Sequence, residues 1–185
     1  MKRFSSFLPL LCALFGVLLT ACTTQRPPRA AHAEWAYDAV VYEMNVRQQT
    51  PEGTFAAAEE RLPYLKELGV DNLWLMPIHP IGENGRKGSL GSYYAIRDYR
   101  AVNPEFGTME DFERFLKKAH EMGFRVILDY VANHTSPDAA WVTEQAPEWY
   151  VRDSTGAPAV QSDWTDLAKL NYDCPDVREA MAGVL

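Results

Sequence analysis

The sequence predicts an α/β fold in which parallel strands alternate with helices. Short runs rich in β-branched and aromatic side chains recur after residue 35, and stretches with helical periodicity separate them. The run at residues 126–128 ends in the polar side chains Asp129, Asn133 and His134. In parallel α/β folds ligands bind at the carboxyl ends of the strands, so this run also predicts where function lies.

The predicted order of elements is β-α-β-α-β, with strands at residues 39–46, 72–76 and 125–130 and helices at residues 55–68 and 109–122. The first helix contains Pro63, which should break or kink it near Leu62, and Gly69 closes it. The second helix begins after Thr108, a good N-cap, and ends at Gly123. The apolar run at residues 126–128 predicts a third strand that is buried on both faces.

The segment after the third strand is predicted to be a long loop. Residues 136–173 show no clear periodicity, and loops of this length inside compact domains are usually functional. A final helix is expected to begin at Pro175 or Asp176 and to run to Leu185.

The first 21 residues have the composition of an export signal. Lys2 and Arg3 precede an apolar stretch that is shorter than the roughly 20 residues of a membrane-spanning helix. The sequence Leu19-Thr20-Ala21-Cys22 resembles a bacterial lipobox, which implies cleavage before Cys22 and lipidation of its sulfur. We therefore expect a signal peptide at residues 1–21, a tether at 22–34, and a protein that is exported and lipid-anchored at the outer membrane or cell surface. A plain secretory signal with an incidental cysteine is the alternative.

The net charge limits the classes of possible binding partner, and the cysteine count limits the possible disulfides. Removing Lys2 and Arg3 with the signal takes the formal net charge from −7 to −9, which argues against nucleic acid as a partner. An acidic, aromatic-rich surface suits neutral sugars. The mature chain would keep only Cys174, so no intramolecular disulfide is expected. No nucleotide-binding or redox motif is present, so no organic cofactor is expected.

Four motifs in order resemble the opening of an α-amylase-family glycoside hydrolase. They are Val41-Tyr42-Glu43, Leu73-Trp74-Leu75-Met76-Pro77, the stretch from Gly91-Ser92-Tyr93-Tyr94 through Asp98-Tyr99 to Thr108, and Asp129-Tyr130-Val131-Ala132-Asn133-His134. The resemblance implies that residues 35–185 form the first three β/α units of a TIM-type (β/α)8 barrel plus a long loop after the third strand. The barrel would be incomplete and truncated before its fourth strand.

The resemblance also implies residue roles. His134 would hydrogen-bond the sugar ring that is cleaved, and Tyr94 would stack against that ring. Asp129 would support its neighbours, and Asp98 would fix the loop after the second strand. The family's nucleophile and general acid lie on later strands, so no catalytic carboxylate is assigned to these 185 residues.

The resemblance implies one candidate metal ion, Ca²⁺. In many family members the asparagine of this motif binds a structural Ca²⁺, so Asn133 is the candidate ligand. Lys169 stands where an aspartate usually helps, and a lysine repels Ca²⁺, which takes several oxygen ligands. The calcium site and its absence both stay open at this point.

The expected function is that of an N-terminal fragment of a retaining hydrolase of α-glucans, such as starch or maltooligosaccharides. A non-catalytic glycan-binding surface lipoprotein and a degenerate remnant are the alternatives. Aromatic side chains in the long loop, which either line a glycan groove or anchor the loop, are Trp141, Trp149, Tyr150 and Trp164.

Overall fold

The computed structural model describes residues 32–160 and 163–185. The chain divides into two units, with the boundary in the sequence between Tyr37 and Asp38. In the first unit the described residues form one 3-10 turn, η1 (Glu34–Ala36). The predicted signal peptide, Cys22 and most of the predicted tether lie outside the described residues. Within the described part, no helix has the length and apolar character needed to cross a membrane.

The second unit contains all the remaining elements. In chain order they are β1 (Val41–Met44), α2 (Val46–Gln49), α3 (Phe55–Glu60), α4 (Leu62–Glu67), β2 (Asn72–Leu75), α5 (Met109–Glu121), β3 (Arg125–Leu128), β4 (His134–Thr135), α6 (Ala140–Glu144), η2 (Pro147–Trp149), β5 (Ala168–Lys169) and α7 (Pro175–Ala182).

The first three strands form one parallel sheet in the order β1-β2-β3. Val41, Asn72 and Arg125 are register partners, so all three strands start at the same level. Their carboxyl ends therefore lie at the same edge of the sheet. The order and direction of the strands confirm the predicted α/β fold of consecutive β/α units.

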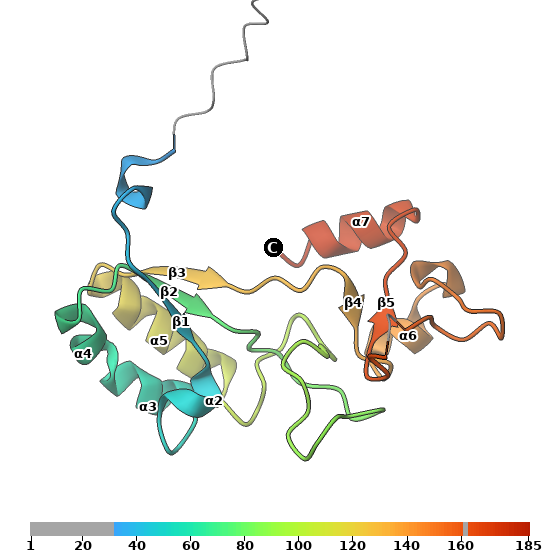
Figure 1. The fold of residues 1–185 in the computed structure, drawn as a ribbon, viewed down its shortest axis with the longest axis horizontal. Coiled ribbons are helices and arrows are strands. Elements are labelled where there is room, and N and C mark those ends of the chain that lie inside the picture. The colour runs from blue at the N-terminus through green and yellow to red at the C-terminus, as the bar shows by residue number, and fades with distance from the viewer. Residues whose placement is uncertain (1–31, 161–162) are drawn as a thin grey trace, which may run out of the picture. The chain divides into compact units, whose positions relative to one another are not determined.

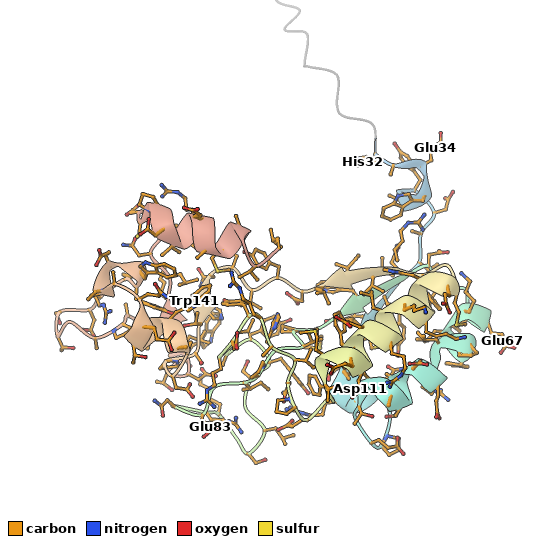
Figure 2. The ribbon with its side chains drawn as sticks, turned by 180° about the vertical axis from the view of Figure 1, so that it is seen from behind. His32, Glu34, Glu67, Glu83, Asp111 and Trp141 are labelled. Carbon is orange, nitrogen blue, oxygen red and sulfur yellow. The ribbon has the colours of Figure 1, made fainter. Side chains whose placement is uncertain are left out.

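Helices α3, α4 and α5 lie together on one face of this sheet (Figure 1). Pro63 sits in the first turn of α4, and the helix predicted at residues 55–68 divides at Arg61, because proline has no N–H to continue the hydrogen-bond ladder. Thr108 and Asp111 form a capping box at the start of α5, where Figure 2 labels Asp111. The first core lies between these helices and the sheet, and its fully buried members include Phe55, Leu62, Leu65, Leu73, Leu75 and Phe115.

The segment after β3 builds a second core of its own. Strands β4 and β5 pair antiparallel, and the second core gathers residues from this pair, from α7 and from the loop that follows β2. Trp149 and Tyr150 are buried in it. Trp141, which Figure 2 labels, packs on Trp149, and the ring centroids of the two are 5.4 Å apart. Three of the four aromatic side chains noted in the sequence therefore anchor this segment, whereas Trp164 is 45 % exposed.

Three sequence-based expectations were wrong. The third strand is not buried on both faces, because Ile127 and Leu128 are 43 % and 44 % exposed and β3 pairs only with β2 among the described residues. The first strand ends at Met44, and Val46 already begins α2. The last helix ends at Ala182 instead of running to the end of the chain, since glycine at position 183 is a poor helix former and serves as the C-cap.

Candidate functional site

His134 is held at the start of β4 with both ring nitrogens engaged. Its Nε2 lies 3.1 Å from the carbonyl oxygen of Tyr94, and its Nδ1 lies 3.0 Å from Nδ2 of Asn133. A carbonyl can only accept and an amide NH₂ can only donate, so the tautomer that satisfies both contacts is neutral with the proton on Nε2. Burial lowers the pKa of His134 below its ordinary value, against the opposing effects of the Tyr94 carbonyl and the charge of Asp166. The imidazole is therefore a neutral N–H donor at physiological pH.

Tyr94 is oriented by Asp129, which follows β3. The Tyr94 hydroxyl donates to Oδ2 of Asp129 at 3.0 Å, and this bond spans 35 residues of sequence. Burial raises the pKa of Tyr94, with a further contribution from this carboxylate, so the phenol stays protonated and donates. Asp129 thus holds the ring in place, which is the supporting role expected for it.

Tyr94, His134 and five other residues line one cavity of about 330 Å³. We call it the Tyr94 cavity, and its lining residues are Lys87, Ser92, Tyr94, His134, Trp164, Asp166 and Leu167. Three parts of the chain build its walls: the loop between β2 and α5, His134 at the start of β4, and the segment between η2 and β5. The structure therefore brings the two predicted sugar-binding residues together.

Two glycines allow the loop between β2 and α5 to approach other segments near the cavity. Gly85 has φ +71°, and a Cβ there would lie 2.6 Å from the carbonyl oxygen of Thr165. Likewise, a Cβ on Gly82 would lie 2.2 Å from Cβ of Ser136. Side chains at these positions would push the contacting segments apart, so both close approaches depend on glycine.

Asp98 lies outside the Tyr94 cavity. Its Oδ1 accepts a hydrogen bond from the backbone N–H of Arg100 at 2.8 Å, which tightens the loop that leads to Tyr99. This contact is of the local, loop-fixing kind that the sequence suggested for Asp98.

The surroundings of Asn133 do not fit a calcium site. Its side-chain NH₂ points at His134, and the β4–β5 pairing places Lys169 opposite His134, one residue away from Asn133. Over residues 32–160 and 163–185, no group of three or more histidine, cysteine, aspartate or glutamate side chains could hold a metal. Calcium takes six to eight oxygen ligands and would be repelled by a lysine. Calcium binding by Asn133 stays an untested prediction that these donors do not favour.

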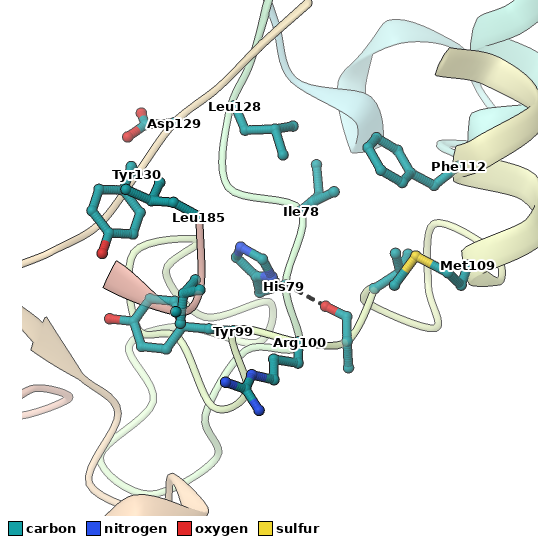
Figure 3. Close-up of a pocket in the computed structure, with 14 residues that line it drawn as sticks. Ile78, His79, Tyr99, Arg100, Met109, Phe112, Leu128, Asp129, Tyr130 and Leu185 are labelled. Carbon is teal, nitrogen blue, oxygen red and sulfur yellow. Dashed lines mark hydrogen bonds between the residues drawn. The ribbon is translucent and has the colours of Figure 1, made fainter. Parts of the chain in front are cut away.

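A second cavity, of about 460 Å³, lies beside the end of β3 (Figure 3). Leu128 lines it together with Phe112 of α5 and Leu185. His79 also faces it, with Nδ1 3.1 Å from the carbonyl oxygen of Ala101, and burial lowers the pKa of this histidine. Asp129 lines this cavity too, so its bond to Tyr94 joins the walls of the two cavities.

Sequence reasoning missed Lys87, Ser92, Asp166 and Leu167 as lining residues. Lys87 and Ser92 belong to a glycine-rich stretch just before Tyr94, and Asp166 immediately precedes the stretch that was inspected for a calcium ligand. The signal in the sequence that could have identified these residues is that they lie next to the motifs already named. Nothing local in the sequence indicates that these two stretches face each other.

Comparisons with known proteins agree with this geometry. The family described as the α-amylase catalytic domain matches residues 35–185. The α-1,4-glucan:maltose-1-phosphate maltosyltransferase of Rhodospirillum rubrum is 44 % identical over 142 residues, which cover 67 % of this chain and 20 % of the relative. Alpha-amylase 3 of Dictyoglomus thermophilum is 33 % identical over 171 residues, which cover 78 % of this chain and 33 % of the relative.

Among solved structures, an α-amylase from Lactobacillus plantarum superposes with a TM-score of 0.77 at 44 % identity. The match covers 79 % of this chain and 35 % of that structure. The chain thus spans about a third or less of the relatives that it matches, which agrees with the expected partial barrel. Because the family match extends over more than half of the sequence, the chain belongs to the α-amylase catalytic-domain family.

Proposed function

We propose that this chain contributes a sugar-binding subsite to a hydrolase of α-glucans, such as starch or maltooligosaccharides. The observation that carries the proposal is that Tyr94 and His134 line one cavity next to the carboxyl end of β3. The names of the relatives support the substrate class, since they include α-amylases and an α-1,4-glucan maltosyltransferase.

The two side chains suit a pyranose ring in different ways. An aromatic face covers the C–H side of a sugar, and Asp129 keeps the Tyr94 ring in place for this contact. The Nε2–H of His134 is occupied by the Tyr94 carbonyl in the structure. A sugar hydroxyl therefore replaces that carbonyl as the acceptor when it binds. The released Tyr94 carbonyl then accepts from water, since Tyr94 is 37 % exposed, so the cost of the exchange is small.

The proposed role of these residues is to position substrate. The family's retaining reaction passes through an oxocarbenium-like transition state and needs a nucleophilic carboxylate and a carboxylic acid. We assign neither to residues 1–185. Asp129 is engaged with Tyr94, and Asp98 with the backbone of its own loop. Bond cleavage in the proposed enzyme then relies on groups from later strands of the barrel.

A non-catalytic glycan-binding protein is the second candidate, and the binding character of the site residues favours it. Both candidates require α-glucan binding, and they differ in turnover. Release of reducing ends from maltoheptaose by the full-length protein would select the hydrolase. Binding without any release of reducing ends would select the glycan-binding protein.

Affinity electrophoresis of the full chain tests the shared claim. Soluble starch in the gel should retard the protein, whereas a β-1,3-glucan at the same concentration should not. Equal mobility in the two gels would contradict the proposal.

We further propose that the protein is anchored to the membrane through a lipid on Cys22. The lipobox resemblance at residues 19–22 supports this. Metabolic labelling with an alkyne palmitate analogue should mark the wild-type protein and not the Cys22→Ser variant. Labelling of both proteins, or of neither, would refute the anchor.

A further inference from the structure

Asn84 and Gly85 form the only Asn-Gly pair in the sequence, and they lie in an exposed turn of the loop between β2 and α5. The backbone N–H of Arg86 donates to the carbonyl oxygen of Glu83 at 3.3 Å, which closes the turn, and Gly85 takes φ +71° at its third position. Turns favour asparagine and glycine at such positions. The pair is also chemically reactive, because glycine places no side chain over the peptide bond that follows the asparagine.

The atoms that would react are not held by the fold. Within residues 32–160 and 163–185, neither the Asn84 side chain nor the Gly85 N–H takes part in a hydrogen bond. Both residues are exposed, so water and hydroxide reach them. Exposed side chains change rotamer rapidly, so Cγ of Asn84 can approach the backbone nitrogen of Gly85 with only a local adjustment of the turn.

The other five asparagines lack this combination. Asn103 precedes Pro104, which has no N–H to lose. The remaining four are followed by residues with large side chains, Val46, Leu73, His134 and Tyr172. Asn171 is held at both ends of its amide, since its Nδ2 donates to the carbonyl oxygen of Glu148 at 2.9 Å and its Oδ1 accepts from the N–H of Asp173 at 3.1 Å. Asn171 is therefore a protected asparagine with which Asn84 can be compared.

We propose that Asn84 is a site of spontaneous deamidation. The backbone nitrogen of Gly85 loses its proton to base and attacks Cγ of Asn84. The N–Cγ bond forms, the Cγ–Nδ2 bond breaks, and Nδ2 takes up a proton and leaves as ammonia. Water then opens the cyclic imide, giving aspartate when the N–Cγ bond breaks and isoaspartate when the bond to the main-chain carbonyl carbon breaks. The sum consumes one water, releases one ammonia and needs no oxidant.

The isoaspartate product would disturb one wall of the Tyr94 cavity. Gly85 packs so closely on the segment before β5 that a Cβ there would lie 2.6 Å from the carbonyl oxygen of Thr165. Nζ of Lys87, which lines the cavity, donates to the carbonyl oxygen of Asp163 at 3.1 Å. Isoaspartate adds one carbon to the main chain, about 1.5 Å of bond length, and so shifts the loop against this segment. This inference concerns the chemistry of the loop and does not depend on sugar binding.

Incubation of the full chain at mildly alkaline pH, followed by peptide mass spectrometry, tests the proposal. The peptide that contains Asn84 should gain the mass expected when an NH₂ group is replaced by OH, and isoaspartyl methyltransferase should label it. The reaction should accelerate with pH, because base removes the proton of the Gly85 nitrogen. It should be at least roughly tenfold faster than at Asn171, whose two side-chain hydrogen bonds must open first.

Asn84→Gln is the matched variant, because its longer side chain closes a ring far more slowly while keeping the amide. Its peptide should stay unmodified and unlabelled. Gly85→Ala is unsuitable, since its Cβ would meet Thr165 and disturb the loop by itself. Equal rates at Asn84 and Asn171 would overturn the proposal. So would an unchanged Asn84 in the folded chain under conditions in which a short Glu-Asn-Gly-Arg peptide deamidates, because the fold would then protect the turn.

Hydrogen exchange separates the longer main chain from the added charge. Asn84→Asp has an ordinary backbone and takes the formal net charge from −7 to −8, as deamidation does. Amides of residues 163–167 should exchange faster in aged protein enriched in isoaspartate than in freshly purified Asn84→Asp or wild type, whereas α5 should exchange equally in all three. Equal exchange of residues 163–167 in aged protein and in Asn84→Asp would overturn the proposed shift of the loop.

Discussion

Replacing Tyr99 by phenylalanine should loosen the segment that carries His134. The Tyr99 hydroxyl lies 2.7 Å from the carbonyl oxygen of Val131 and 2.6 Å from that of His134, and its single O–H proton is shared between these two acceptors. The residue is 7 % exposed, and burial raises its pKa far above the usual range, so the hydroxyl keeps its proton. One buried donor thus ties the middle of the connection between β3 and β4 to the start of β4.

The size of the effect follows from what the variant leaves behind. Tyr99→Phe keeps the ring and its packing but leaves buried carbonyls without this donor, at a cost of about 1–3 kcal/mol. For a unit of this size each kcal/mol shifts the melting temperature by about 2–4 °C, so a decrease of roughly 2–12 °C is expected. Maltotriose affinity should fall as well, because the backbone of His134 is no longer held.

Tyr130→Phe is the matched control. Its hydroxyl donates to the carbonyl oxygen of Met181 at 2.5 Å, but the residue is 37 % exposed and water can replace the lost bond. Thermal melts followed by near-ultraviolet circular dichroism should show a clearly smaller decrease for this variant. Equal melting temperatures for Tyr99→Phe and Tyr130→Phe would refute the reasoning.

Three further variants test other parts of the structure. Thr108→Ala removes the capping box of α5 and should lower the free energy of unfolding in urea by about 1 kcal/mol; no change would show that the cap is dispensable. Gly82→Ala places a Cβ 2.2 Å from Cβ of Ser136 and should lower the free energy of unfolding by about 1–3 kcal/mol. Its control, Gly183→Ala, has its nearest neighbouring atom at 3.5 Å and should leave the free energy of unfolding nearly unchanged. Equal losses in the two variants would contradict the close approach of Gly82 to Ser136. Burial lowers the pKa of His134 in the folded chain. As the pH falls through about 6.5, the ordinary pKa of histidine, this side chain takes up a proton in the unfolded chain but not in the folded chain. The contribution of His134 to the free energy of unfolding that is present at pH 7.5 is therefore lost as the pH falls through 6.5. In His134→Gln the free energy of unfolding should depend less steeply on pH between 7.5 and 5.5, and identical slopes would rule out this contribution.

Much of the fold follows from local sequence signals. The capping box at Thr108 and the break before Pro63 depend on residues within one or two turns, and both are found where the sequence predicts them. The exposure of Ile127 and Leu128 was mispredicted, because a run of apolar residues identifies a strand but does not say what covers it. Burial is decided by neighbours that are distant in sequence.

The candidate site, like the fold, could be predicted only in part from local sequence. Tyr94 and His134 could be named from short motifs, and the structure places them in one cavity. Asp166 could not be named as a lining residue, because it reaches the cavity only when its segment folds back against the loop of Lys87, 79 residues earlier in the numbering. That approach depends on glycine at position 85, whose role becomes visible only when its partner is known.

The most direct test of the sugar-binding site is a calorimetric titration of the full chain and its His134→Ala variant with maltotriose. Binding by the wild type and at least a tenfold loss in the variant are expected, because the imidazole N–H that now donates to the Tyr94 carbonyl is the proposed donor to a sugar hydroxyl. His120→Ala changes an exposed histidine on α5 and should bind as the wild type does. Equal affinities of the wild type and His134→Ala would contradict the assignment of this cavity as an α-glucan subsite.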